Sequence, residues 1–345
     1  MIQCFLSAEQ LPEGTAKVMY VSRHELLSVS ICSNLPGHDT PVCLIRSGTV
    51  QELVNDFVDR LETIACRVED LLSERLGGVL HSLRALVRRR EEVERACRAR
   101  GSKEGRAAVR TTAVRRVLHR LLQWIRAVPV VGFNSQRYDL NVLKSPLMRR
   151  LVRVDAVVDG GGGDDDGDDA TSCFDSDSGN CDSGEAGDDD DGDDGNRPLR
   201  FVVKRSNALT VVETRRLRFL DITNFIAPGF SYERYLKAYG CELTKGYFPY
   251  EWMDSLEKLR CTGLPPREAC CSRLKGTGLT DEEYALCRHV WRAQDMRTFA
   301  DFLDWYNNLD VEPMLQAIQR QSVVYENKGI DVLKGGITLP GLAVL

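Results

Sequence analysis

The chain of 345 residues lacks several signatures that would assign it directly to a class of protein. Its 12 cysteines include no Cys-x-x-Cys pair, so neither a zinc ribbon nor a secreted disulfide framework is indicated. Its five histidines are scattered without the spacing of metal ligands, which leaves a histidine metal site or a Ser-His-Asp triad without support. We therefore expect reduced thiols and an intracellular protein.

Long apolar runs are also missing. No stretch approaches the roughly 18 residues that cross a bilayer, and the first six residues lack the basic flank of a signal peptide. We expect a soluble protein, nuclear or cytoplasmic rather than secreted, with no membrane partner.

Lys and Arg are absent from residues 155 to 196, a segment of mainly Asp, Gly and Ser with 17 acidic residues. Such a composition cannot bury enough apolar surface to offset the entropy of ordering, so we expect a disordered acidic insert. The remaining chain carries all 46 Lys and Arg but only 34 of the 51 Asp and Glu. A basic surface of this kind attracts phosphate backbones, whereas the insert would attract basic partners.

The first part of the chain predicts strands followed by helices. Apolar stretches at residues 16 to 21, 26 to 33 and 42 to 46, the first two separated by His24 and Glu25, predict an antiparallel meander that forms the first half of a sheet. Apolar residues recur three and four apart from Val54 to Leu72, which predicts an amphipathic helix against that sheet.

Two further helical patterns, at residues 79 to 98 and 106 to 126, predict a helical hairpin with a flexible turn at residues 101 to 105. Arginine is frequent in both patterns. Their basic surface is either a contact for nucleic acid or a solvated helix face.

The second part predicts further strands. Apolar runs at residues 128 to 133 and 218 to 222 predict buried strands, and residues 151 to 158 and 199 to 204 predict strands that neighbour each other. The fold class that follows is α/β, a mixed sheet flanked by helices.

The last part predicts helices. One covers about residues 232 to 239, and a capping box at residues 280 to 283 starts another that runs to about Arg288. The next pattern, residues 293 to 305, directs three apolar side chains toward the core: Phe299, Phe302 and Leu303.

Two short strings carry the chemistry. The first, GFNSQRYD at residues 132 to 139, follows a predicted strand, so Asn134 emerges where open α/β sheets bind ligands. The second, YNNLD at residues 306 to 310, lies in a helical pattern that puts Tyr306 and Asp310 on one face. Each string ends in a carboxylate preceded by an aromatic residue, a pairing that suits metal-dependent cleavage of phosphodiesters.

These strings resemble the second and third exonuclease motifs of family B DNA polymerases. FLDI at residues 219 to 222, KGYFPY at residues 245 to 250, and the closing strings GID and LPGLA resemble the protein-primed branch, which serves certain viruses, organelle plasmids and transposons. The likeness runs from about Val21 to Leu345, interrupted by the acidic insert. It implies a ribonuclease H-like exonuclease fold in a DNA-directed DNA polymerase that binds nucleotide and DNA during DNA replication.

The resemblance also implies roles for five residues. Asp139, Tyr306 and Asp310 would be catalytic, with Asp139 and Asp310 as ligands of Mg²⁺ or Mn²⁺ and Tyr306 orienting the attacking water. Asn134 and Tyr138 would contact single-stranded DNA at the frayed 3′ end of a primer-template. A terminal priming protein is a further implied partner.

The chain departs from the family at the first exonuclease motif, where an Asp and a Glu stand two residues apart. Aligning the first six residues with that motif puts Met1 and Gln3 at the carboxylate positions, and the polymerase motifs Tyr-x-Asp-Thr-Asp and Ser-Leu-Tyr-Pro are absent. We therefore expect a fragment with little or no exonuclease activity. Two alternatives are a non-catalytic module that binds single-stranded DNA and an interaction protein that uses its acidic insert.

These expectations divide the chain into four parts. Residues 1 to 154 and 197 to 328 form the two parts of an exonuclease-like domain, and residues 155 to 196 form the insert between them. Residues 329 to 345 are then a truncated lead-in to the absent polymerase palm.

Overall fold

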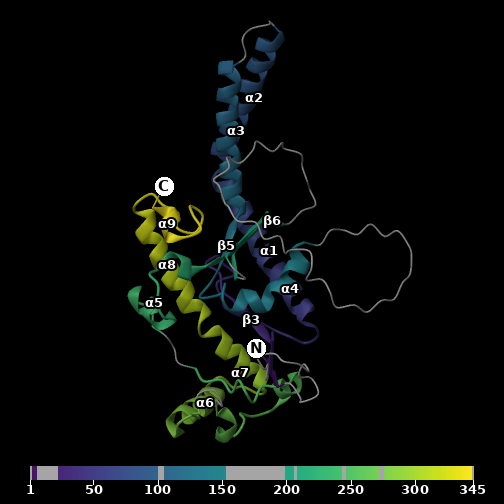
Figure 1. Cartoon of the computed structure of the whole chain (residues 1–345), viewed down its shortest axis with the longest axis vertical. Helices are drawn as coiled ribbons and strands as arrows, with labels where there is room; N and C mark the ends of the chain where they lie inside the picture. Colours follow the sequence, from purple (N-terminus) through teal and green to yellow (C-terminus); the bar gives the residue numbers. More distant parts are fainter. Residues whose placement is uncertain are drawn as a thin grey trace, which may run out of the picture.

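The computed structural model describes seven stretches of the chain, which are residues 2–5, 22–99, 105–152, 199–205, 208–242, 246–271 and 276–343. Figure 1 shows a central sheet with helices around it and a helical hairpin that projects away from the body of the molecule. The chain is therefore α/β, as predicted. The predicted acidic insert and most of the predicted hairpin turn lie outside the described residues.

The central sheet has four strands in the order β5-β8-β7-β6. β5 and β8 run parallel, with Val130 beside Phe219 and Gly132 beside Asp221, and the other two pairings are antiparallel. The strand bounds are β5 (Val128–Gly132), β6 (Leu199–Arg205), β7 (Ala208–Thr214) and β8 (Leu217–Asp221). Three of these strands were predicted, and β7 was not.

Two antiparallel strand pairs lie apart from this sheet. They are β1 (Ile2–Phe5) with β2 (Ser22–Glu25) and β3 (Ser28–Ile31) with β4 (Val42–Ile45). The last two strands of the predicted meander are confirmed, and the first, at residues 16 to 21, lies outside the described residues. Two parts of that prediction are wrong. His24 and Glu25 belong to β2 instead of separating strands. β3 and β4 form a two-stranded sheet of their own, whose apolar side chains pack against the same core as α1 and the central sheet.

The predicted first helix is α1 (Val50–Arg75), which begins at a capping box formed by Thr49 and Glu52. Its buried face packs against α4 (Asp139–Leu151), whose buried residues recur three and four apart. The strand predicted at residues 151 to 158 is therefore wrong at its start, because Leu151 is the last residue of α4 and is fully buried in the core between α1 and the sheet. The rest of that prediction lies outside the described residues.

The predicted hairpin is confirmed as α2 (Gly77–Ala99) and α3 (Gly105–Arg126), which pack against each other. An ion pair of 2.8 Å between Arg115 of α3 and Glu91 of α2 shows that these two residues lie at the same height along the hairpin. In Figure 1 the hairpin extends well beyond the sheet.

The remaining α-helices of the described residues are α5 (Tyr232–Ala238), α6 (Asp281–Ala293), α7 (Phe299–Asn308), α8 (Val311–Glu326) and α9 (Leu339–Leu342). The capping box at Thr280 is confirmed, although α6 continues to Ala293. The helix predicted at residues 293 to 305 is wrong at its start, because Asp295 takes a left-handed φ of 48° and breaks the helix. Phe299 and Phe302 are buried as predicted. Across the described stretches, no helix combines the length and the apolarity that a membrane span requires.

Candidate functional site

The candidate site begins where the parallel strands β5 and β8 end side by side. Asp221, the last residue of β8, is fully buried and accepts four hydrogen bonds. Its Oδ1 accepts from the backbone N–H groups of Asn134 (3.0 Å) and Thr223 (2.9 Å) and from the Thr223 hydroxyl (2.7 Å), and its Oδ2 accepts from the N–H of Gln136 (3.0 Å). Asp221 therefore fixes the strand-end turn, which we define as residues 133–138.

The strand-end turn has an unusual backbone that its sequence permits. Asn134 has a left-handed φ of 56°, a conformation that Asn tolerates better than most residues. At Gly132 an added Cβ would lie 2.6 Å from the Cβ of Ser135, so only glycine allows the turn to close this tightly. The result is that Asn134 is exposed at the end of β5, as predicted.

Asp139 is the first residue of α4 and follows the turn directly. Burial of its carboxyl, and secondarily the negative charge of Asp221, raises the pKa of Asp139 from 3.8 to about 6. Asp139 as a residue is exposed, so its carboxyl is shielded from water only in part. Asp139 is thus partly protonated close to neutral pH and lies next to a second carboxylate.

Tyr138 precedes Asp139 and is 45% exposed. Burial raises the pKa of its phenol, and Asp139 and Tyr250 raise it further. The contribution from Tyr250 shows that the aromatic loop, which we define as residues 246–250, lies close to the start of α4.

Tyr306 lies in α7 and is held by the aromatic loop. Its hydroxyl is 2.7 Å from the hydroxyl of Tyr250, and its ring stacks on Phe248 with 5.1 Å between centroids. Gly246 makes this approach possible, because a Cβ there would lie 2.9 Å from Cδ2 of Tyr306 and 2.6 Å from Cδ1 of Leu309. The loop is therefore packed directly against the predicted catalytic tyrosine.

Asp310 lies at the junction of α7 and α8. The prediction that Tyr306 and Asp310 share one helix is wrong, because α7 ends at Asn308. The two residues between α7 and α8, Leu309 and Asp310, nevertheless keep right-handed helical dihedrals. The charge of Asp310 contributes to raising the pKa of Tyr306. Tyr306 and Asp310 therefore remain close to each other, and burial raises the pKa of the Asp310 carboxyl.

A path of contacts joins the strand-end turn to Asp310. The ring of Phe133 packs edge-on against Tyr232 at 5.2 Å, and the Tyr232 hydroxyl donates to the carbonyl of Asp310 at 2.5 Å. Tyr250 is hydrogen bonded to Tyr306 and contributes to raising the pKa of Tyr138. The path links the turn that carries Asn134 and Tyr138 to the junction that carries Asp310, whereas none of the described contacts joins Asp139 to Asp310.

The residues of this region do not by themselves make up a two-metal centre. In the part of the chain that the structure describes, no three His, Cys, Asp or Glu side chains gather closely enough to hold a metal ion. Asp221 directs its oxygens to four donors, which leaves Asp139 and Asp310. Gln3, aligned with the first exonuclease motif, lies in β1, which pairs with β2 instead of the central sheet. We derive no metal-dependent step from these residues.

In comparisons with known proteins, no family model, no curated protein and no solved structure matches this chain.

Three residues of the site were not among the predicted site residues, although Phe248 and Tyr250 belong to the KGYFPY string that supported the family resemblance. They are Tyr232, Phe248 and Tyr250. The aromatic loop contains four aromatic or proline residues after a glycine, a composition that favours close ring packing and was a usable signal. Tyr232 stands at the start of a short helix, and nothing in its sequence neighbourhood indicates its bond to Asp310.

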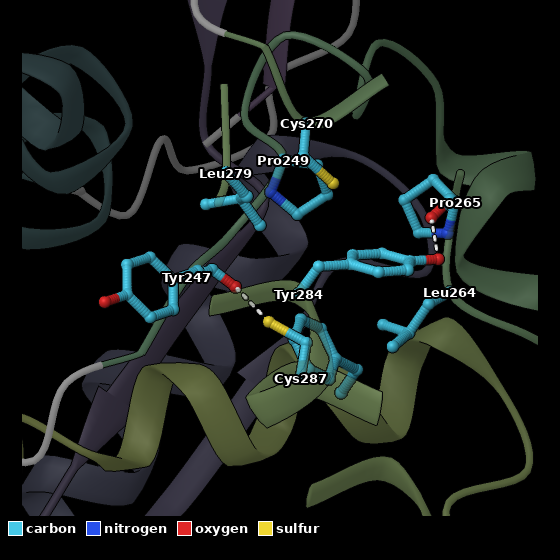
Figure 2. A pocket seen from close by; sticks show the side chains of 9 residues that line it. Tyr247, Pro249, Leu264, Pro265, Cys270, Leu279, Tyr284 and Cys287 are labelled. Atoms are coloured by element: carbon cyan, nitrogen blue, oxygen red, sulfur yellow. Dashed lines mark hydrogen bonds between the residues drawn. The ribbon is translucent and has the colours of Figure 1, made fainter. Parts of the chain in front are cut away.

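Figure 2 shows a pocket beside the aromatic loop, lined by Tyr247 and Pro249 of that loop and by residues of α6, α7 and neighbouring loops. Its volume is about 10 Å³, room for about one water molecule. Burial is the main cause that raises the pKa of Cys270 and of Cys287 to about 11, so both thiols stay protonated and are poor nucleophiles. This hollow is a feature of core packing and holds no catalytic group.

Proposed function

We propose that this chain is an exonuclease-like domain, of the ribonuclease H-like type in protein-primed family B DNA polymerases, that binds the 3′ end of single-stranded DNA and is impaired in cleavage. One observation carries the proposal. A path of contacts through Phe133 and Tyr232 links the second motif at the end of β5 to Asp310 of the third motif at the α7–α8 junction. The α/β sheet with parallel β5 and β8 is compatible with that fold type.

Exposed aromatic rings support binding of single strands. Tyr138 is 45% exposed and Tyr250 is 49% exposed. Base stacking on such rings contributes about 1–3 kcal/mol per base and tolerates any sequence. Asn134 and Arg137, exposed on the strand-end turn, add a hydrogen-bonding amide and a positive charge for the backbone.

The state of Asp139 supports impaired cleavage. A carboxylate must lose its proton to bind a metal ion, and partial shielding from water, with a smaller effect of the Asp221 charge, raises the pKa of Asp139 to about 6. In a site with four carboxylates, the bound dications would offset the free-energy cost of deprotonating Asp139. The residues described here provide Asp139 and Asp310, so we expect weak affinity for Mg²⁺ or Mn²⁺.

DNA binding is tested by fluorescence anisotropy with a 5′-labelled oligothymidylate, with a circular single strand as competitor. We expect Tyr138→Ala and Tyr250→Ala each to weaken binding by about fivefold or more, in line with the loss of one stacked base. Phe201→Ala is the matched control, because Phe201 is an exposed aromatic residue on β6, 41% exposed and away from the site. Equal loss in all three variants, or equal competition by circles, would contradict binding of a 3′ end.

Cleavage is tested on the same oligonucleotide with Mg²⁺ or Mn²⁺. We expect the wild-type chain to release no more product than Asp139→Asn. Degradation from the 3′ end by the wild type that is abolished in Asp139→Asn would show an active exonuclease and would overturn the proposed impairment.

A further inference from the structure

The projecting hairpin carries a net positive charge, because its arginines far outnumber its glutamates. Helices α2 and α3 together contain 12 arginines, 3 glutamates and no lysine or aspartate. Arg88, Arg89, Arg116 and Arg120 are exposed on it. A surface like this repels a second copy of itself and attracts an acidic partner.

The same hairpin exposes apolar side chains at a regular spacing. On α2 they are Val79, Leu86 and Val93, with 51%, 38% and 47% of their surface exposed. On α3 they are Val117 and Trp124, with 54% and 40% exposed. A spacing of seven residues is close to two helical turns, so each set forms a stripe along its helix.

The two stripes lie on the same face of the hairpin. Val79, Leu86 and Trp124 each directly precede a buried residue, namely Leu80, Val87 and Ile125. Because the two helices are antiparallel, a twofold rotation relates them, and an equal offset from the packed side puts both stripes on one face. We call these five residues, Val79, Leu86, Val93, Val117 and Trp124, the apolar row.

The ion pair between Arg115 and Glu91 shows which residues of α2 and α3 lie at the same height along the hairpin. With the helices aligned in this way, the residues of the two stripes alternate along the hairpin. Trp124 falls between Val79 and Leu86, and Val117 falls between Leu86 and Val93. The row follows the seam between the helices for about 21 Å, because each residue adds about 1.5 Å of helix. At its lower end Lys334 covers one side of the Trp124 ring. A seam of alternating side chains between two helices is the geometry that receives a third helix.

Arginines border this row on both sides. Arg89 lies three residues after Leu86 and four before Val93, and Arg120 lies three after Val117 and four before Trp124, so each neighbours two members of the row. We propose that the apolar row is a docking surface for an amphipathic helix of a partner protein whose apolar stripe is flanked by acidic residues. Duplex DNA would use the arginines and leave the apolar row exposed, and a second copy would bring like charges together.

The test uses a labelled synthetic helix of about three heptads, with Leu at the a and d positions and Glu at the e and g positions. Its affinity for the full chain is measured by fluorescence anisotropy. Two comparison peptides keep the length, one with Lys in place of Glu and one with Ser in place of Leu. We expect the Leu and Glu peptide to bind and both comparison peptides to bind at least about tenfold more weakly.

The variants alter only exposed positions, so we expect the fold to be retained. Circular dichroism of each variant checks the helix content. We expect the combination Leu86→Glu, Val93→Glu and Val117→Glu to weaken binding of the Leu and Glu peptide at least about tenfold. The matched control is Val323→Glu with Val324→Glu, because these valines on α8 are 52% and 51% exposed. Equal affinity of the triple variant and the control for the peptide would overturn the proposal.

Three other occupants are measured with the same variants. Self-association is followed by sedimentation, and binding is followed with duplex DNA and with vesicles of phosphatidylserine. If the triple variant abolishes one of these interactions of the wild-type chain, and the Leu and Glu peptide does not bind, the row serves that occupant and the proposal is overturned. The proposal is supported if the Leu and Glu peptide binds and the triple variant leaves self-association, duplex DNA binding and vesicle binding unchanged.

Discussion

The hydroxyl groups of Tyr250 and Tyr306 lie 2.7 Å apart, which ties the aromatic loop to α7. A hydrogen bond of this kind contributes about 1 kcal/mol net. We expect Tyr250→Phe and Tyr306→Phe each to lower the free energy of unfolding by about 1 kcal/mol, measured by urea denaturation. The double variant should cost less than the sum of the two, because both single changes remove the same bond. Fully additive losses would show that the bond does not contribute.

Gly246 lets the aromatic loop approach Tyr306. A Cβ at this position would lie 2.6 Å from Leu309 Cδ1, so Gly246→Ala must displace the side chains around Tyr306. We expect a loss of about 1–3 kcal/mol in unfolding free energy, together with weaker binding of single-stranded DNA. Gly263→Ala is the control, because nothing lies within 4 Å of its added Cβ. A neutral result for Gly246→Ala would contradict the close packing of the loop.

Asp221 accepts four hydrogen bonds in a fully buried position. Asp221→Asn replaces one accepting oxygen by an amino group that faces donors, so we expect a loss of about 3 kcal/mol or more in unfolding free energy. The matched change Asp59→Asn removes an exposed ion pair with Arg150, which should cost at most about 1 kcal/mol. Thermal and urea unfolding of the two variants compare these costs.

Asp139 makes stability depend on pH. Its pKa is raised to about 6 in the folded chain, so folding favours the protonated form. The stability it contributes is fully present below pH 4, is lost as pH rises from about 4 to about 6, and changes no further above that. We expect Asp139→Asn to remove this part of the pH dependence of the urea midpoint, whereas the exposed control Asp295→Asn keeps the wild-type profile.

The same titration affects DNA binding. Protonated Asp139 carries no charge to repel phosphate, so affinity for single strands should rise as pH falls through about 6. Asp139→Asn should bind equally at pH 5 and pH 7. An unchanged pH dependence in this variant would place the responsible group elsewhere.

Much of the helical structure could be predicted from the sequence, because it depends on local patterns. Val54 to Leu72 showed a clear three-and-four spacing, and Thr280 began a capping box that the structure confirms. The break before α7 could not be predicted, because it depends on a left-handed Asp295 that the surrounding packing selects. The end of α4 was misjudged because Leu151 continues a helical stripe and the apolar residues after it favoured a strand.

The candidate site was only partly predictable. The sequence indicated Asn134 through its place at the end of a predicted strand, and the motif resemblance indicated the other four residues. The residues that contact these site residues could not be predicted. Tyr232 and Asp310, for example, are 78 positions apart and meet only through tertiary packing. Asp221 is similar, because its role depends on the parallel register that sets it beside Gly132.

The contact between Asn134 and Asp221 spans 87 positions of sequence. Closing so long a stretch carries a modest equilibrium penalty, since each doubling of length costs only about 0.6 kcal/mol, but high contact order slows the search for the native pairing. We therefore expect the parallel pairing of β5 with β8 to form after the local helices. The geometry of the strand-end turn, which depends on that pairing, would then be acquired late in folding.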